Sequence, residues 1–125
     1  MSGGQILVVE DNEKNMKLVR DVLQATGYRT LEATTGGQAV GLAIEHGPDL
    51  VLMDIRLPDM DGIEVLGRLR ADDRTASIPV LAVTAQSMQG DRERFLAAGF
   101  DDYVSKPVNI VDLVATVKQH CDRRG

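Results

Sequence analysis

The sequence predicts an α/β fold, a doubly wound, five-stranded parallel sheet with five helices on both faces. Short runs rich in Val, Ile and Leu alternate five times with longer segments of helical period. Three of the runs are apolar throughout, which is typical of strands covered on both faces. With 125 residues the chain is long enough for one hydrophobic core and too short for two, so residues 1–125 are expected to form a single domain.

The apolar runs locate the strands. The first, third and fourth are continuously apolar, as inner strands are, whereas the second alternates. In that run Tyr28, Thr30 and Glu32 face one way, opposite the intervening residues, so it is expected at an edge of the sheet. The expected strands are 5–9, 28–33, 49–53, 78–83 and 102–105.

The segments between the runs have recognisable helix ends. Thr35 with Gln38, and Asp61 with Glu64, form capping-box patterns at the starts of the second and third helices. Glycines follow the ends of the first, second and fourth helices at 27, 47 and 99. The five helices are expected to begin near residues 13, 35, 61, 87 and 109.

Composition excludes several classes of function. The net charge is −5, from 14 Lys and Arg against 19 Asp and Glu, so no basic face is available for nucleic acid or an anionic membrane. The apolar runs are far shorter than the ~20 residues of a membrane span, and no signal-peptide pattern opens the chain, so a cytoplasmic protein without membrane insertion is expected. The single cysteine, Cys121, excludes an internal disulfide.

Polar residues follow the inner strands at their carboxyl ends, where open α/β sheets bind ligands. Glu10 and Asp11 follow the first run, Asp54 the third and Thr84 the fourth, and Lys106 comes just after the fifth. Two carboxylates ~4 Å apart would repel by about 4 kcal/mol at an effective dielectric constant near 20. Three carboxylates at one edge therefore need a cation, and oxygen ligands without His or Cys suit Mg²⁺.

Such a set of residues is suited to phosphorus chemistry. A strand-end aspartate alone is more often a helix cap or a surface charge, but Asp54 stands together with acidic, hydroxyl and ammonium groups. A carboxylate beside Mg²⁺ can act as a nucleophile toward phosphorus. Lys106 would neutralise charge on the phosphoryl oxygens while Thr84 donates a hydrogen bond. The sequence therefore predicts a phosphoryl-acceptor site.

Four motifs in this order resemble the receiver domain of bacterial response regulators, the CheY-like family, over essentially the whole chain. They are VVEDN (8–12), LVLMDIRLPDMDG (50–62), VLAVTA (80–85) and YVSKP (103–107). Within the family the chain is most similar to stand-alone regulators of the DivK type and to receivers attached to hybrid kinases. The resemblance implies the strand order 2-1-3-4-5 and a single-domain response regulator of a two-component or phosphorelay system.

The resemblance also implies roles for individual residues. Asp54 would take the phosphoryl group from a histidine kinase or a histidine phosphotransferase, and a downstream target protein would sense the change. Tyr103 would be the switch aromatic, and the Lys106–Pro107 bond would be cis. The chain departs from the family at Arg56, where a smaller or neutral side chain is usual. The Arg56 cation, and Gln86 two residues after Thr84, would modulate the lifetime of the acylphosphate. The implied Mg²⁺ ligands are Glu10, Asp11, Asp54 and the Arg56 carbonyl, and the implied phosphoryl contacts are Thr84 and Lys106.

Other classes fit the motifs less well. A phosphatase of the haloacid dehalogenase type would need D-x-D after the first strand, where this chain has EDN. A flavodoxin-like binder would need a phosphate loop there, and no nucleotide-binding G-x-x-x-x-G-K-[ST] is present. A pure interaction scaffold that is no longer phosphorylated would be expected to lack a residue of the phosphoryl-acceptor site, and here none is missing. The favoured interpretation is a signalling protein whose only chemistry is self-phosphotransfer and autodephosphorylation.

Overall fold

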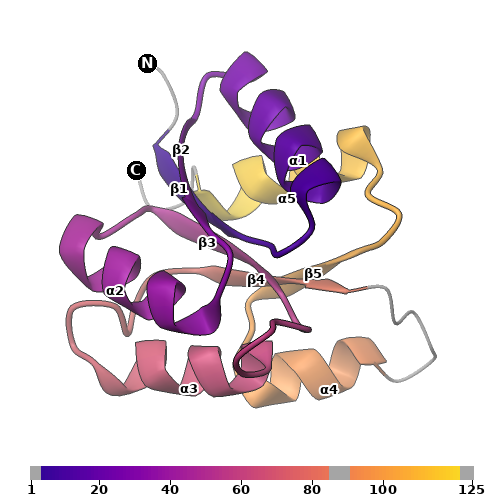
Figure 1. Ribbon diagram of the computed structural model, residues 1–125. Helices are drawn as coiled ribbons and strands as arrows, with labels where there is room; N and C mark the ends of the chain where they lie inside the picture. The colour runs from indigo at the N-terminus through magenta and orange to yellow at the C-terminus, as the bar shows by residue number, and fades with distance from the viewer. Residues whose placement is uncertain (1–3, 85–90, 122–125) are drawn as a thin grey trace.

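The structure, a computed structural model, describes residues 4–84 and 91–121 (Figure 1). Within these residues, five strands and five helices alternate, as predicted. The strands are β1 (Gln5–Val9), β2 (Arg29–Ala33), β3 (Leu50–Asp54), β4 (Val80–Thr84) and β5 (Asp102–Ser105). The helices are α1 (Glu13–Ala25), α2 (Gly36–His46), α3 (Gly62–Ala71), α4 (Asp91–Ala98) and α5 (Ile110–Cys121).

The strands form one sheet in the order β2-β1-β3-β4-β5, and every neighbouring pair is parallel. This confirms the predicted fold class and strand order. β2 lies at an edge of the sheet, as predicted. Its burial does not alternate as expected, because Arg29 and Glu32 point to opposite faces and are both exposed, whereas Ala33 is buried. β3 and β4 end one residue later than predicted, because the parallel ladder continues through Asp54 and Thr84.

Each face of the sheet is covered by its own layer of helices (Figure 1). Alternate side chains of a strand enter opposite layers: Leu7 and Val9 pack with residues of α2, α3 and α4, whereas Ile6 and Val8 pack with residues of α1 and α5. Both sets of side chains are buried, which explains why the inner strands are apolar at every position. None of the helices in the described part of the chain is long and apolar enough to cross a bilayer.

The helices begin at capping residues that the sequence partly predicted. The Thr35 hydroxyl accepts a hydrogen bond from Gln38 N at 3.2 Å, and Asp61 accepts one from Glu64 N at 2.9 Å. The reciprocal bonds of the capping boxes differ from the expected ones. Gln38 Oε1 accepts from Thr34 N at 2.9 Å, while the Glu64 carboxylate pairs with Arg68 one turn later. The predicted start of the fourth helix, near 87, lies outside the described residues.

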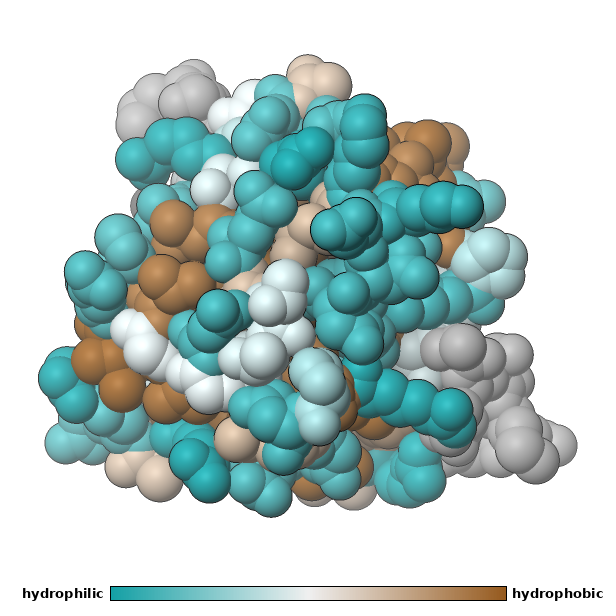
Figure 2. Space-filling view, in the orientation of Figure 1, coloured by the Kyte–Doolittle hydropathy of each residue, from teal (hydrophilic) through white to brown (hydrophobic). Residues whose placement is uncertain are grey.

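Hydrophobic residues on the molecular surface gather in two places in the view of Figure 2. One lies over α2 and the other beside the start of α5. Ile110 and Val111 in the first turn of α5 are 48% and 76% exposed. Most of the remaining surface in that view is hydrophilic.

Arg70, near the end of α3, fastens the amino-terminal edge of the sheet. Its guanidinium donates hydrogen bonds to the carbonyls of Ala76, Ile78 and Gly99 at 3.1, 2.7 and 3.3 Å. It also pairs with Asp101 at 3.0 Å, and the same carboxylate accepts from the backbone N–H of β4 residue 80 at 2.8 Å. One side chain thus joins α3 to the segments that precede β4 and β5.

Replacing Arg70 with Met is expected to destabilise the protein by about 1–3 kcal/mol, because partly buried carbonyls lose their donor. The control is Arg68→Met, since Arg68 lies on the same helix with an exposed side chain and an i,i+4 partner in Glu64. That substitution should cost less than about 0.5 kcal/mol. Urea unfolding of both variants measures the difference; equal losses would show that Arg70 is only a surface cation.

Candidate functional site

Three carboxylates meet at the carboxyl edge of the sheet. Glu10 and Asp11 follow β1, and Asp54 is the last residue of β3. β1 and β3 are neighbours, with Val9 opposite Met53, so the register brings the three side chains together. An oxygen from each carboxylate lies within 4.8 Å of those from the other two. Glu10 and Asp54 are buried, at 4% and 7% exposure, whereas Asp11 is exposed.

Lys106 supplies a cation to this cluster. Its ammonium lies 2.9 Å from Asp54 Oδ2 and 2.9 Å from Glu10 Oε1. The backbone N–H of Lys106 donates to Thr84 O at 2.7 Å, which ties the segment after β5 to the end of β4. The following bond, Lys106–Pro107, is cis, as the resemblance implied.

The second oxygen of each buried carboxylate accepts a bond from a backbone N–H two residues further along. Asp54 Oδ1 accepts from Arg56 N at 3.1 Å, and Glu10 Oε2 accepts from Asn12 N at 3.3 Å. Both carboxylates are therefore held in the same way, between Lys106 and the backbone of the loop that follows their own strand.

These contacts change the proton affinities of the site. The pKa of Glu10 is raised to about 7. Burial is the largest cause; the hydrogen bond and negative charge of Asp54 also raise the pKa, whereas Lys106 lowers it. Burial lowers the pKa of Lys106, but its bonds to Asp54 and Glu10 raise it by more, so the net shift is upward and Lys106 stays an ammonium. When Glu10, Asp11 and Asp54 are all ionised, the single Lys106 ammonium leaves the cluster with a net negative charge.

The six residues expected to contact metal or phosphoryl group line one cleft of about 240 Å³. Thr84, 3% exposed, comes from the end of β4, and the exposed Arg56 side chain comes from the loop after β3. Asn12 and Asn15 at the start of α1 complete the lining. The full lining is Glu10, Asp11, Asn12, Asn15, Asp54, Arg56, Thr84 and Lys106.

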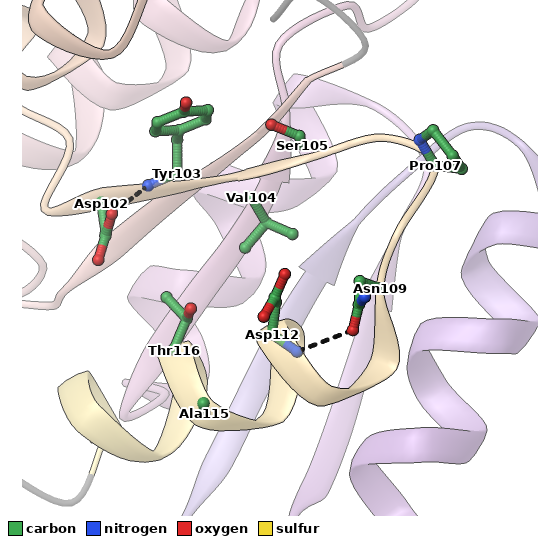
Figure 3. Close-up of a pocket in the computed structure, with 9 residues that line it drawn as sticks. All are labelled: Asp102, Tyr103, Val104, Ser105, Pro107, Asn109, Asp112, Ala115 and Thr116. Carbon is green, nitrogen blue, oxygen red and sulfur yellow. Dashed lines mark hydrogen bonds between the residues drawn. The ribbon is translucent and has the colours of Figure 1, made fainter.

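Tyr103 lies outside this cleft. It is half-buried on β5, its ring packs against the core layer formed with α2, α3 and α4, and its centroid is 6.4 Å from that of Phe95. Figure 3 shows its ring on the side of β5 opposite to the α5 residues Asp112 and Thr116. Gln86, the other residue expected to modulate the site, lies outside the described residues.

A larger hollow, of about 350 Å³, lies between β5 and α5 (Figure 3). Its lining includes Asp102, Ser105, Asn109, Asp112 and Thr116, but none of the three clustered carboxylates. It therefore belongs to the surface of β5 and α5 and not to the acidic cleft.

Sequence reasoning found the side chains of the cleft but missed several of their contacts. The bonds from Arg56 N and Asn12 N were not expected, since any residue supplies a backbone N–H. The contact of Lys106 with Glu10 was also missed, because Lys106 was paired with a phosphoryl group alone. Asn15 was not singled out, although its position one turn after Asp11 was a usable indication.

The donor set fits Mg²⁺. Glu10, Asp11 and Asp54 offer only carboxylate oxygens, which are the ligands of hard divalent cations. The Arg56 N–H already points at Asp54, so the backbone of this residue lies at the site and its carbonyl is a further candidate oxygen. None of the described residues that line the cleft is His or Cys.

Comparison with known proteins gives concordant results. The response regulator receiver domain family matches residues 6–118. The polar-differentiation response regulator DivK of Brucella anthropi is 48% identical over 115 residues, 92% of this chain and 94% of that protein. The receiver domain of a sensor histidine kinase from Pseudomonas aeruginosa, solved with a magnesium ion coordinated in its active-site cleft, is 37% identical with a TM-score of 0.88. That comparison covers 97% of this chain and 99% of the other.

A receiver domain from a Francisella response regulator is also similar, with a TM-score of 0.90 and 27% identity over 98% of this chain and 99% of that chain. The family match, the identity to DivK and the shared fold all agree with the four motifs. The chain belongs to the response regulator receiver family, a family of signalling proteins.

Proposed function

We propose that Asp54 accepts a phosphoryl group from a phosphohistidine on a histidine kinase or histidine phosphotransferase, in the cytoplasm. The observation that carries this proposal is the Lys106 ammonium 2.9 Å from Asp54 Oδ2, in a cleft that also contains Glu10 and Asp11. A carboxylate between a fixed cation and a set of metal ligands has the surroundings that phosphoryl transfer requires.

In the transfer, an oxygen of Asp54 attacks phosphorus while the bond from phosphorus to the imidazole nitrogen breaks. The electron pair stays on the imidazole, which takes up a proton, and the product is the mixed anhydride of Asp54 and phosphate. The Lys106 ammonium then pairs with a phosphoryl oxygen, and the Thr84 hydroxyl donates to another. Mg²⁺ held by Glu10, Asp11, Asp54 and the Arg56 carbonyl would supply positive charge to the phosphoryl oxygens.

Loss of the phosphoryl group uses the same cleft. Water attacks phosphorus, inorganic phosphate leaves, and the Asp54 carboxylate is restored. The exposed Arg56 guanidinium at the cleft would contact phosphoryl oxygens or restrict water, and so modulate the acylphosphate lifetime. Gln86 remains a second expected modulator. The chain's only reactions are those of its own Asp54, so it does not act on a separate substrate.

The exposed apolar residues at the start of α5 support a protein as the donor. Ile110 and Val111 follow the Lys106–Pro107 turn, so they lie in the segment that brings Lys106 to the cleft. Apolar side chains exposed beside a charged site are typical of surfaces that bind another protein. A docked kinase or phosphotransferase would cover them while presenting its phosphohistidine to Asp54.

The proposed output is a change of protein contacts made through α4, β5 and α5. A phosphoryl group brings close to two negative charges and three acceptor oxygens to the site. Thr84 would move toward these oxygens, and Tyr103 on the adjacent strand would rotate into the space behind it. Since Tyr103 packs against Phe95 of α4, its rotation would alter the surface offered to a downstream target protein.

Asp54 is expected to be the sole acceptor. Incubation with acetyl phosphate and Mg²⁺ should add the mass of one phosphoryl group to the wild-type protein and none to Asp54→Asn. Asp73→Asn, exposed just after the end of α3, is the matched control and should be labelled normally. Asp11→Ala and addition of EDTA should both suppress labelling. Peptide mapping that finds the label on another residue, or normal labelling in EDTA, would contradict the assignment.

Glu10 should lower the stability of the metal-free protein above its ordinary pKa. Since its pKa rises from 4.5 to about 7 on folding, the folded protein holds this proton more tightly, and stability falls as pH rises between these values. Glu10→Gln should remove this decline and be more stable than wild type near pH 8 in EDTA.

Urea unfolding across pH measures this effect, and Glu13→Gln, exposed in the first turn of α1, is the control. Parallel pH profiles for wild type and Glu10→Gln would refute the prediction.

Thr84→Ala is expected to separate phosphoryl binding from the switch. Beryllofluoride, a mimic of the bound phosphoryl group, should still bind this variant with Mg²⁺. The NMR shift changes expected for wild type at Tyr103 and along α5 should be mostly lost in Thr84→Ala, because the hydroxyl that moves is absent. Thr30→Ala on the edge strand β2 should behave as wild type. Undiminished changes in Thr84→Ala would refute the mechanism.

A further inference from the structure

The loop between β3 and α3, residues 55–61, carries the Arg56 backbone into the acidic cleft. Its base is closed by Gly62 N, which donates to Ile55 O at 2.7 Å, and by an antiparallel bridge between Arg56 and Asp61. Glycine suits position 62, since a Cβ there would lie 3.0 Å from Asp54 O, closer than an ordinary van der Waals contact. The base of the loop is therefore fixed against the end of β3.

The tip of the loop is fastened to a different helix. Asp59 Oδ1 accepts from Gly36 N at 2.7 Å, and Asp59 Oδ2 accepts from Gly37 N at 3.0 Å. Gly36 and Gly37 are the first two residues of α2, whose N–H groups have no partner within the helix. These bonds lower the pKa of Asp59, so it is a carboxylate at neutral pH, as a helix N-terminus favours.

The first turn of α2 is also shaped to receive this loop. Gly36 is buried, and a Cβ at this position would lie 2.6 Å from Met60 Cγ and 2.7 Å from Val65 Cγ2. The helix can approach Met60 this closely only because residue 36 is glycine. The contact between Asp59 and α2 is therefore part of a fitted junction and not a chance surface pairing.

We propose that Asp59 is a positioning residue for the metal site. By fastening the loop tip to α2, it fixes the peptide units on both sides of Arg56. The Arg56 N–H orients Asp54, and the Arg56 carbonyl is a ligand in the Mg²⁺ site proposed above, on which this inference rests. Asp59 is exposed and does not line the cleft, so its effect on Mg²⁺ is exerted through the loop.

The chain offers a matched control. Thr35 caps the same end of α2 through its bond from Gln38 N, within the helix region itself. Thr35→Ala therefore weakens the α2 N-terminus without removing the bonds that hold the loop. Asp59→Asn, which keeps one carbonyl oxygen as an acceptor, is the conservative variant.

The experiment compares wild type, Asp59→Ala, Asp59→Asn and Thr35→Ala. Calorimetry measures Mg²⁺ affinity, and NMR measures amide exchange at Gly62 in the metal-free proteins. Asp59→Ala should weaken Mg²⁺ binding about tenfold, the scale found for residues that orient metal ligands. It should also speed Gly62 exchange. Asp59→Asn should fall between Asp59→Ala and wild type, and Thr35→Ala should match wild type in both measurements.

Two outcomes would overturn the inference while leaving the metal site intact. One is wild-type Mg²⁺ affinity in Asp59→Ala. The other is an equal loss of affinity in Asp59→Ala and Thr35→Ala, which would reduce Asp59 to a helix cap. If wild type itself fails to bind Mg²⁺, the proposed site is wrong and this inference falls with it.

Discussion

The bonds from the Lys106 ammonium to Glu10 and Asp54 are the interaction on which the site depends. Parallel strands bring their carboxyl ends to one edge, so the fold itself gathers carboxylates that repel each other. One ammonium 2.9 Å from both buried carboxylates offsets much of this repulsion. It leaves the cluster with excess negative charge, and a divalent cation can compensate that charge.

The two edges of the sheet therefore have different roles. At the amino-terminal edge, the Arg70 guanidinium donates hydrogen bonds to three carbonyls and forms an ion pair with Asp101, so its charge and its donors are satisfied. At the carboxyl edge, burial raises the pKa of Glu10 to about 7, a sign that the site is held in an electrostatically unfavourable state. Sites of this kind are retained for function at a cost in stability, and the rest of the fold supplies that stability.

The sequence predicted the structure best where the type of residue determines whether its side chain is buried or exposed. The unbroken apolar runs of β1, β3 and β4 required cover on both faces, and the polar residues that end them marked the cleft at Asp11, Asp54 and Thr84. It was least informative about contacts made by the backbone or between distant segments. The bond from Arg56 N to Asp54, and that from Gly36 N to Asp59 across 23 residues, have no counterpart in local periodicity.

The alternation of side chains along the strands divides the interior into two layers, and among the residues that the structure describes no buried side chain belongs to both. Substitutions in one layer lie across the sheet from the other, and effects of well-separated substitutions are close to additive. Core residues of α1 and α5 can therefore be substituted without changing the packing of α2, α3 and α4 against the sheet. Core residues of α2, α3 and α4 can likewise be substituted without changing the packing of α1 and α5. This independence allows the packing of each layer to change on its own while the edge that carries Asp54 stays the same.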